Sequence, residues 1–476
     1  MAAPAHGALA GFVVAYLAVS LAVGAYAATR VRGAADYASA RRRFGTALVT
    51  ATVFATWFGA ETVLGIPATF VKEGLRGLVA DPFSALACLA LVALAFARPL
   101  FRLDLITLGD YFRGRYGRAA EVALTLAIAF SYLGWIAAQL VALGLAMNVL
   151  SGGMIDTRTG ILAGAAVVLA CTMAGGMLSV AFTDFFQAAV IVAGLGYVTW
   201  VVVDLAGGAA PVLEAAADSG RMRLLPEADL RSVLAWISAA LVVVLGSVPQ
   251  QDVLQRITSS RDEGTSVRST FLGGVVYFAV ASLPILLICA ALVIDARLVG
   301  KLIDDDSQLI LPTLILERTP FAVQVLFFGA LVSAILSTAS AVLLAPAVAL
   351  AENVVRPIVK PRDDRAVLAM MRLTVLGVAV AVTVMALSSK LSIYQLVNES
   401  GKVVLVSSFV PLAAGLYWRR ANALGAHLSF FAGLLTWIAL EWMAPEAAMP
   451  PALAGFAAGV AGMVAGSLLP ARRTTR

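Results

Sequence analysis

The sequence contains little charge for its length. Of its 476 residues only 13% are Asp, Glu, Lys or Arg, whereas 61% are hydrophobic. A soluble globular protein carries about 25% charged residues. The shortage extends over the whole chain, since apolar runs of roughly 20 residues, long enough to cross a bilayer, recur from end to end. The low charge therefore excludes a separate soluble domain and predicts an all-α integral membrane protein.

Cysteine and histidine are also scarce. The three cysteines, Cys88, Cys171 and Cys289, all lie in apolar runs, and the two histidines are His6 and His427. This supply excludes a disulfide framework and argues against a metal site built on thiolate or imidazole. The sequence also lacks a nucleophile–base pair, a phosphate loop and the spacing of a metal hydrolase, so we expect no enzymatic activity.

The apolar runs predict about thirteen transmembrane helices in a single domain, residues 1–476. The first run is too long for the core of a signal peptide and is kept as a span. Two outer connections, about 205–231 and 295–318, are longer than the others and are expected to carry short amphipathic helices. The thirteen runs are 7–29, 46–71, 77–97, 119–150, 158–176, 178–204, 232–249, 269–294, 319–351, 368–388, 392–417, 422–444 and 448–470.

Positive charge is distributed unevenly between the connections. Most of the 34 Lys and Arg residues fall in alternate connections, such as 98–118, 356–372 and the C-terminal tail. This positive-inside pattern predicts an N-terminus outside, a C-terminus in the cytoplasm and a location in the cell membrane. The net charge of +6 is therefore a topology signal, and no nucleic-acid partner is expected beside the lipid bilayer.

Two of the predicted spans are interrupted by helix-breaking residues. Gly59, Gly65 and Pro67 interrupt the second span, and Gly246 and Pro249 interrupt the seventh. Broken helices at matching positions of two halves indicate inverted repeats with a binding site at the breaks. The first repeat would cover about 46–204 and the second about 232–417, with extra helices at 7–29, 422–444 and 448–470.

Hydroxyl side chains interrupt the apolar run 319–351. Ser337 and Thr338 are adjacent, and Ala334 lies one turn earlier. Hydroxyl and carbonyl oxygens are the ligands of small hard cations, so together with the broken second span they predict a cation site near the midplane of a transporter. The alternative is that both hydroxyls bond back to carbonyls of their own helix, as is common in membrane helices.

Six short motifs follow one another along the chain: Ala60-Glu-Thr-Val-Leu-Gly65; Thr107-Leu-Gly-Asp-Tyr-Phe112 with Arg115-Tyr-Gly117; Gly175-Gly176 with Thr183-Asp184-Phe-Phe-Gln187; Pro249-Gln-Gln-Asp-Val-Leu-Gln-Arg256; Ala334-Ile-Leu-Ser-Thr338; and Phe409-Val-Pro-Leu412. In this order they resemble the sodium:solute symporter family, which includes sodium/sugar, sodium/proline, sodium/pantothenate and choline carriers. The resemblance covers nearly the whole chain. It implies a LeuT-type fold with inverted five-helix repeats and thirteen helices, and sodium-coupled import of a small organic solute by alternating access.

The resemblance also implies where the co-transported sodium ion binds, between the broken second span and the ninth. A helix break suits such a site, because it frees carbonyls that regular helical hydrogen bonds otherwise consume. The implied ligands are the carbonyls of Ala55, Phe58 and Ala334 and the hydroxyls of Ser337 and Thr338.

Asp184 lies toward the inner end of the sixth span, where an unpaired acid is costly. By resemblance, this position lies near the cytoplasmic release route for sodium. In some members of the family it also helps to form a second sodium site, with hydroxyls at the positions of Ser340 and Ala341. Because Ala341 has no hydroxyl, one sodium ion per cycle is favoured. The alternative role for Asp184 is a helix cap or a salt bridge to a cytoplasmic arginine.

Glu61, Glu399 and Lys402 are charged residues that also lie inside predicted spans. Glu61 is expected to support the unwound backbone by accepting N–H bonds without touching sodium. Glu399 and Lys402 are spaced i, i+3 on the eleventh span and face each other, so they can neutralise one another. A structural ion pair is favoured over a role in the permeation path.

The substrate is expected beside the sodium, between the two broken helices. Sugar is disfavoured because family sugar carriers have Gln where this chain has Thr62, and the seventh span offers few polar partners. The sequence around Trp57 looks more like that of choline-type carriers, whose cationic ligand can bind against the faces of aromatic rings. An amino acid, a monocarboxylate, a vitamin and a quaternary amine all stay open. Candidate pocket residues are Trp57, Thr62, Tyr132, Trp135, Gln139 and Trp236.

Two other classes of function stay open. A sodium-independent facilitator or channel would not need the hydroxyls of Ser337 and Thr338, so their removal distinguishes it from a symporter. A symporter-like membrane sensor is disfavoured, because the chain ends six residues after the last predicted span.

Overall fold

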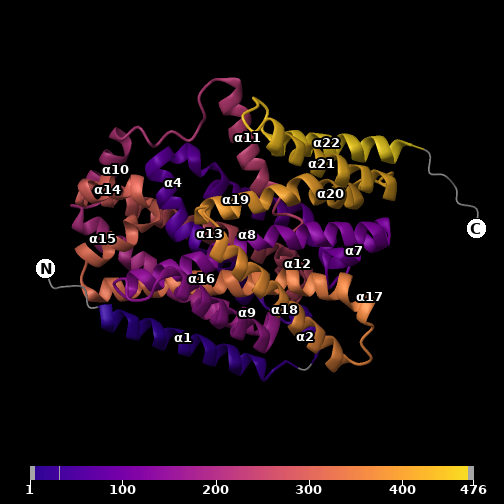
Figure 1. Cartoon of the computed structure of the whole chain (residues 1–476), viewed down its shortest axis with the longest axis horizontal. Coiled ribbons are helices and arrows are strands. Elements are labelled where there is room, and N and C mark those ends of the chain that lie inside the picture. The colour runs from indigo at the N-terminus through magenta and orange to yellow at the C-terminus, as the bar shows by residue number, and fades with distance from the viewer. Residues whose placement is uncertain (1–5, 32, 470–476) are drawn as a thin grey trace, which may run out of the picture.

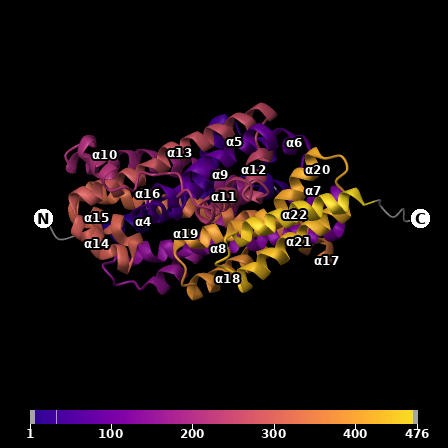
Figure 2. The same ribbon diagram turned by 90° about the horizontal axis from the view of Figure 1, so that it is seen from above.

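The computed structural model describes residues 6–31 and 33–469, and apart from one isolated β-bridge its regular elements are all helices. Long helices lie side by side along the longest axis of the molecule (Figure 1). Helix α1 (His6–Ala28) begins at one end of this axis and α22 (Pro451–Leu468) ends at the other, and the view from above agrees (Figure 2). The described chain therefore starts and finishes at opposite ends of the helix bundle.

The first broken helix consists of α3 (Thr46–Trp57) and, after a gap, a π-helical turn at Glu61–Gly65 that continues into α4 (Ile66–Glu73). The two halves are bent by 54°. Gly59 lies in the gap, and a Cβ atom there would be 2.4 Å from Oε2 of Glu61. The glycine therefore allows the Glu61 carboxylate to fold against the broken backbone.

The second broken helix consists of α11 (Leu230–Val244) and α12 (Gln251–Ser259), with Gly246 and Pro249 between them. All nine residues of α12 are buried, although most of them are polar. Buried polar side chains need hydrogen-bond partners, so neighbouring helices have to supply partners for the side chains of α12.

Helix α16 (Phe321–Leu350) is enclosed by the rest of the protein, and every residue from Phe327 to Ala349 is buried. It packs against α3, α8 (Arg118–Leu150) and α9 (Thr157–Leu205). Such burial is expected for a helix that is apolar on all sides. The hydroxyls of this helix therefore face protein and not lipid.

Helix α9 is two helices joined at Gly176, where the backbone leaves helical geometry (φ 53°, ψ −140°). A single helix of 49 residues would be about 73 Å long, more than twice the hydrocarbon thickness of a bilayer. Glycine is required at this point, because a Cβ would lie 2.4 Å from the carbonyl oxygen of Tyr37 and the φ angle is positive. This kink falls at the predicted boundary between the runs 158–176 and 178–204.

Ten described helices are long and apolar enough to cross a membrane, or eleven if α3 and α4 form one span. The architecture is therefore that of a multi-pass membrane protein, while the count of thirteen stays a prediction. Further membrane-length segments are Leu75–Arg102, α13 (Glu263–Ile294), Phe321–Val359, α18 (Asp364–Ser388), Ile393–Tyr417 and α21 (Ala423–Met443).

Short helices lie at both ends of the bundle. The two long connections carry α10 (Ala209–Asp218), α14 (Ala296–Asp305) and α15 (Ile310–Arg318), as expected, and these three gather at one end (Figure 1). The other end carries α2 (Ala34–Ser39), α7 (Leu108–Tyr116) and α17 (Arg356–Val359).

Candidate functional site

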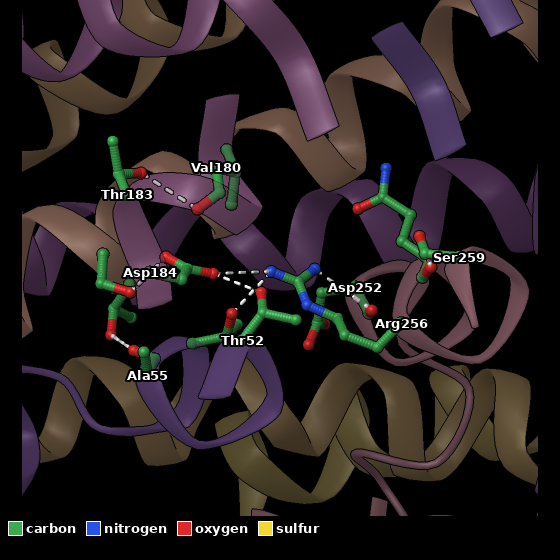
Figure 3. Close-up of polar contacts among 12 residues, drawn as sticks. Thr52, Ala55, Val180, Thr183, Asp184, Asp252, Arg256 and Ser259 are labelled. Carbon is green, nitrogen blue, oxygen red and sulfur yellow. Dashed lines mark hydrogen bonds and ion pairs between the residues drawn. The ribbon is translucent and has the colours of Figure 1, made fainter. Parts of the chain in front are cut away.

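A cluster of oxygen atoms lies where α3, α9 and α16 meet (Figure 3). Ser337 Oγ donates to Oδ1 of Asp184 at 2.5 Å, and Thr338 Oγ1 donates to the carbonyl of Ala55 at 3.3 Å. Thr52 Oγ1 donates to Oδ2 of the same aspartate. All five residues are buried. The break in the first helix, the hydroxyl pair and Asp184 are therefore brought into one place.

Both hydroxyls of the pair bond to other helices. The contrast is Ser333 on the same helix, whose Oγ donates to the carbonyl of Gly329, four residues earlier, at 2.6 Å, and also lies 2.5 Å from the hydroxyl of Tyr16 on α1. The back-bonded alternative thus describes Ser333 but not the contacts of Ser337 and Thr338. Of the other implied ligands, Phe58 follows the last residue of α3 and Ala334 lies one turn before Thr338.

The cluster has the chemistry of a small hard cation site. A cation with oxygen ligands at roughly 2.4 Å holds neighbouring ligands about 3.4 Å apart, and the Thr338 hydroxyl lies 3.3 Å from the Ala55 carbonyl. The donor set near this point consists of hydroxyls, a carbonyl and a carboxylate, without sulfur or imidazole. Such a set suits an alkali or alkaline-earth ion better than a transition metal.

Asp184 also faces a buried arginine. Arg256 Nη2 of α12 is 3.9 Å from Asp184 Oδ2, and both side chains are nearly inaccessible, with exposures of 3% and 0%. The same guanidinium donates to Thr56 Oγ1 at 2.6 Å and to the carbonyl of Asp252 at 3.2 Å. The salt bridge considered from the sequence therefore exists, but with an enclosed arginine. Ser340 is buried two residues beyond Thr338.

The polar residues of the Pro249–Arg256 motif attach α12 to three other segments. Gln251 accepts from the backbone of Leu108 at 3.0 Å, and Gln255 donates to the carbonyl of Ala38 at 3.2 Å. Asp252 accepts from the hydroxyl of Tyr132. These bonds satisfy side chains that would otherwise be costly inside a membrane protein. The motif therefore fixes the α12 half of the second broken helix.

A small cavity of about 60 Å³ lies between the two broken helices, beside α13 and α19 (Ile393–Val404). None of its described lining residues is Lys, Arg or His. Two carboxylates and four aromatic side chains dominate its walls: Trp57, Glu61, Asp81, Trp135, Tyr277 and Tyr394.

Each carboxylate in the cavity is held by neighbours. Glu61 accepts from Trp135 Nε1 at 2.9 Å and from Gln139 Nε2 at 2.7 Å, while Gln139 Oε1 accepts from the backbone N–H of Ala60 at 2.9 Å. Gln139 thus joins the acid to the broken backbone. Asp81 Oδ1 accepts from the Tyr277 hydroxyl at 2.5 Å.

The sequence-based pocket candidates divide into three groups. Trp57 and Trp135 line the cavity. Thr62 is fully buried with its hydroxyl 3.1 Å from that of Tyr277, and Tyr132 and Gln139 are fully buried side chains that support lining residues. Trp236 lies elsewhere and donates to the carbonyl of Leu224 at 3.0 Å.

Among the lining residues that were not found from the sequence are Asp81, Tyr277 and Tyr394. Their signal was weak, because tyrosines in apolar helices are usually packing or interface residues. Asp81 stands alone beside a proline in the run 77–97, and an acid inside an apolar run is a functional-site signal.

The predicted pair of Glu399 and Lys402 forms, with Lys402 Nζ 2.7 Å from Oε1 of Glu399. Lys402 also lies 3.7 Å from Oε1 of Glu441 on α21. Neither residue is among those that line the cavity. The pair connects α19 to one of the helices outside the predicted repeats.

The broken helices, the enclosed oxygen cluster and the cavity beside it define a secondary transporter with a LeuT-like fold. Solved structures agree on the fold. A Na⁺-coupled sialic acid symporter superposes with a TM-score of 0.83 at 18% identity, over 98% of each chain. A transporter of the nucleobase-cation-symport-1 family gives a TM-score of 0.58 at 17% identity, over 90% of this chain and 94% of that one.

The model of the sodium:solute symporter family matches residues 37–433. A high-affinity choline transporter of Caenorhabditis elegans is 28% identical, covering 83% of this chain and 69% of the relative. The human high-affinity choline transporter is 26% identical (90% and 75%), and a proline transporter of Bacillus subtilis 24% (89% and 87%). The chain belongs to the sodium:solute symporter family. It is a sodium-coupled symporter of a small solute and not an enzyme.

Proposed function

We propose that this symporter carries a small organic cation into the cell together with one sodium ion per cycle. The observation that carries the proposal is the cavity with Glu61 and Asp81 in its walls and no basic side chain among its described lining residues. A monocarboxylate or an anionic vitamin would meet two acids there without a counter-charge. An organic cation is stabilised by the carboxylates and by the faces of Trp57 and Tyr394.

The relatives support a cationic solute to a limited degree. Two high-affinity choline transporters share 26–28% identity with this chain, and choline is a cation. Identity at this level spans several solutes within the family, since a human sodium/iodide cotransporter is 27% identical. The cavity of this chain therefore carries the argument for a cation, and the relatives only agree with it.

For sodium we propose the carbonyls of Ala55, Phe58 and Ala334 and the hydroxyls of Ser337 and Thr338. The contact between Thr338 and Ala55 supports this assignment, because it joins one proposed hydroxyl to one proposed carbonyl across two helices. Asp184 supplies the negative charge beside this set through its bond to Ser337. One sodium ion fits the single hydroxyl pair, since Ala341 provides no further oxygen from its side chain.

We also propose thirteen spans with the N-terminus outside and the C-terminus in the cytoplasm. If the kink at Gly176 divides α9 into two spans and α11 with α12 forms one more, the eleven spans become thirteen. The arginine-rich α7 then lies in the cytoplasm with α17. The inverted repeats would cover about 46–204 and 232–417 of one domain.

Uptake into proteoliposomes tests the proposal. Radiolabelled small organic cations are offered with sodium or with potassium outside, and we expect accumulation only with sodium. In the double variant Ser337→Ala/Thr338→Val the sodium concentration for half-maximal uptake should rise about tenfold or more, since each lost ligand costs about 1–3 kcal/mol. Ser333→Ala on the same helix is the control, because its hydroxyl bonds to Gly329 and Tyr16 and to none of the proposed sodium ligands. Equal uptake with potassium would identify a sodium-independent facilitator and refute the proposal.

A further inference from the structure

The polar groups that line the cavity are rich in hydrogen-bond acceptors. Glu61 and Asp81 contribute four carboxylate oxygens, and Gln250 also lines the cavity. Gln250 is 6% exposed, and its Oε1 has no partner among the described residues. Buried acceptors without donors are costly, so an acceptor-rich cavity favours a ligand that brings donors.

The donors that the protein itself supplies do not saturate these oxygens. Trp135 and Gln139 give Glu61 one hydrogen bond on each oxygen, and Tyr277 gives Asp81 one on Oδ1. An ionised carboxylate has about four lone-pair sites. Each acid in the cavity therefore retains capacity for donors from a ligand.

The two acids are arranged around one tyrosine. The Tyr277 hydroxyl is 2.5 Å from Asp81 Oδ1 and 3.1 Å from the hydroxyl of Thr62, the residue that follows Glu61. The Tyr277 ring in turn packs edge-on against Trp57, with 6.4 Å between ring centroids. Both carboxylates thus lie in the walls of the same cavity, and the hydrogen bonds from neighbouring side chains restrict their movement.

A quaternary ammonium uses only part of this cavity. Its methyl groups can contact the aromatic faces, but it has no N–H to offer, so the spare lone pairs of both acids would stay unpaired around it. A protonated amine or a guanidinium satisfies them with charge-assisted hydrogen bonds, which are roughly twice as strong as neutral ones. One carboxylate and the aromatic rings would suffice for a quaternary ligand, whereas this cavity has two.

We infer that the cationic group of the substrate carries N–H donors, as in a protonated amine or a guanidinium, and is held jointly by Glu61 and Asp81. This inference rests on the proposed function, because it specifies the cation that the same cavity receives. Trp57 and Tyr394 supply apolar area for the rest of the ligand. The specificity then depends on hydrogen-bond donors and not on charge alone.

Stepwise methylation of one ligand tests the inference. In the series of ethanolamine, its N-methyl and N,N-dimethyl derivatives and choline, each step replaces one N–H group by a methyl group, and butylamine, butylguanidine and butyltrimethylammonium form a second set. Binding to the purified protein is measured in sodium by thermal stabilisation. We expect affinity to fall with each methyl group, by about tenfold or more from the primary to the quaternary ammonium, because each methyl group removes one hydrogen-bond donor to the carboxylates.

The outcomes separate the two claims. If choline or butyltrimethylammonium binds as tightly as its primary counterpart, the inference is wrong and the proposed organic cation survives. If no cation in either series binds, whereas anionic or neutral solutes do, the proposed function fails as well. If the amine and guanidinium ligands bind and their quaternary counterparts do not, the result supports both the inference and the proposed function.

Substitutions in the cavity provide an independent test. Asp81→Asn should reduce the ratio of primary to quaternary affinity by about tenfold, because its amide replaces a charged acceptor by a partial donor. Tyr277→Phe removes the hydroxyl that donates to Asp81, so it should change the same ratio. This variant replaces Asp81→Asn in the test if that variant does not fold. Asp305→Asn, an exposed acid on α14, is the matched control. A purely structural role for Asp81 would weaken all cations equally and leave the ratio unchanged.

Discussion

Several interactions converge on Asp184. Its two oxygens accept from Ser337 and Thr52, and the Arg256 guanidinium lies 3.9 Å away. The contact with Ser337 places the carboxylate beside one of the proposed sodium ligands, so capture and release of the ion cannot be assigned to separate positions along α9. A charge this close to a partly dehydrated cation affects both steps.

We therefore predict that Asp184→Asn raises the sodium concentration needed for half-maximal stabilisation of the purified protein. The expected change is about tenfold or more, because two unit charges 4 Å apart interact by about 4 kcal/mol at an effective dielectric constant near 20, before dehydration is subtracted. Sodium titrations followed by thermal unfolding measure the effect. The control is Glu214→Gln, an exposed acid on α10.

Two results would contradict this view of Asp184. An unchanged sodium titration would leave the aspartate with a structural role only. A Hill coefficient near two in the unmodified protein, lost in Asp184→Asn, would instead indicate a second sodium ion near Asp184 and Ser340.

The residues around the cavity show where sequence reasoning succeeds. Ser337, Thr338 and Asp184 could be selected because polar side chains inside apolar runs are expensive and therefore conspicuous. Asp81 has the same property, but its partner Tyr277 is 196 positions away in sequence, and nothing local indicates that they meet. Trp236 was selected as an aromatic residue near a break, yet it donates to Leu224 outside the cavity.

Among the elements, α12 connects the cavity wall to the oxygen cluster. Tyr132 stacks on Trp135 with 6.1 Å between ring centroids and donates to Asp252. From the same helix, Arg256 reaches Thr56 and Asp184. A movement of α12 would therefore change the cavity wall and the oxygen cluster together.

We predict that Arg256→Gln lowers the sodium concentration for half-maximal stabilisation and reduces the rate of transport. The guanidinium is the positive charge that faces Asp184, so its removal leaves the carboxylate to attract sodium alone, and the affinity should increase by roughly tenfold. Turnover should fall because α12 loses its bonds to α3. Sodium titration of the purified protein and initial uptake rates measure the two effects.

Arg115→Gln is the matched control for this experiment. Arg115 also donates to backbone carbonyls, those of Gly415 and Trp418, but it lies on α7, away from the oxygen cluster. Weaker sodium binding in Arg256→Gln would show that the arginine organises the site and does not compete with the ion. The sodium affinity of Arg256→Lys should lie between those of the unmodified protein and Arg256→Gln, since lysine keeps the charge but not the planar guanidinium.

Both helix breaks could be predicted, because glycine and proline disturb regular helical geometry and are conspicuous within an apolar run. The number of spans could be approached but not fixed. Helix α11 has only 15 residues, and α12 is too polar to be recognised by hydropathy. These two elements are stable in the bundle through long-range contacts, which a local pattern does not contain.

For the whole molecule, the charge of the proposed solute sets how steeply accumulation depends on voltage. One sodium ion and one monovalent cation move two charges per cycle. Each charge contributes about 2.3 kcal/mol per 100 mV, so two charges change the equilibrium accumulation ratio about tenfold per 30 mV. A neutral or zwitterionic solute with one sodium ion would need about 60 mV for the same change.

We predict the steeper dependence for a monovalent primary amine in proteoliposomes. Membrane potential is set with potassium and valinomycin at equal sodium on both sides, and the accumulation ratio at steady state is measured against voltage. A slope near 60 mV per decade would refute a cationic solute moved with one sodium ion. A slope near 20 mV would correspond to three charges and therefore to a second sodium ion.

The burial of α12 has a consequence for the synthesis of the protein. Its nine residues include Asp252 and Arg256, and the apolar α11 before it has 15 residues, fewer than a membrane-spanning helix requires. A charged residue at the centre of an inserting helix costs about 2.5–3.5 kcal/mol, so this segment is a poor substrate for insertion on its own. Its place in the bilayer depends on α3 and α8, which leave the ribosome earlier and supply Thr56 and Tyr132. We therefore expect the second broken helix to insert with the help of contacts from the N-terminal half of the chain.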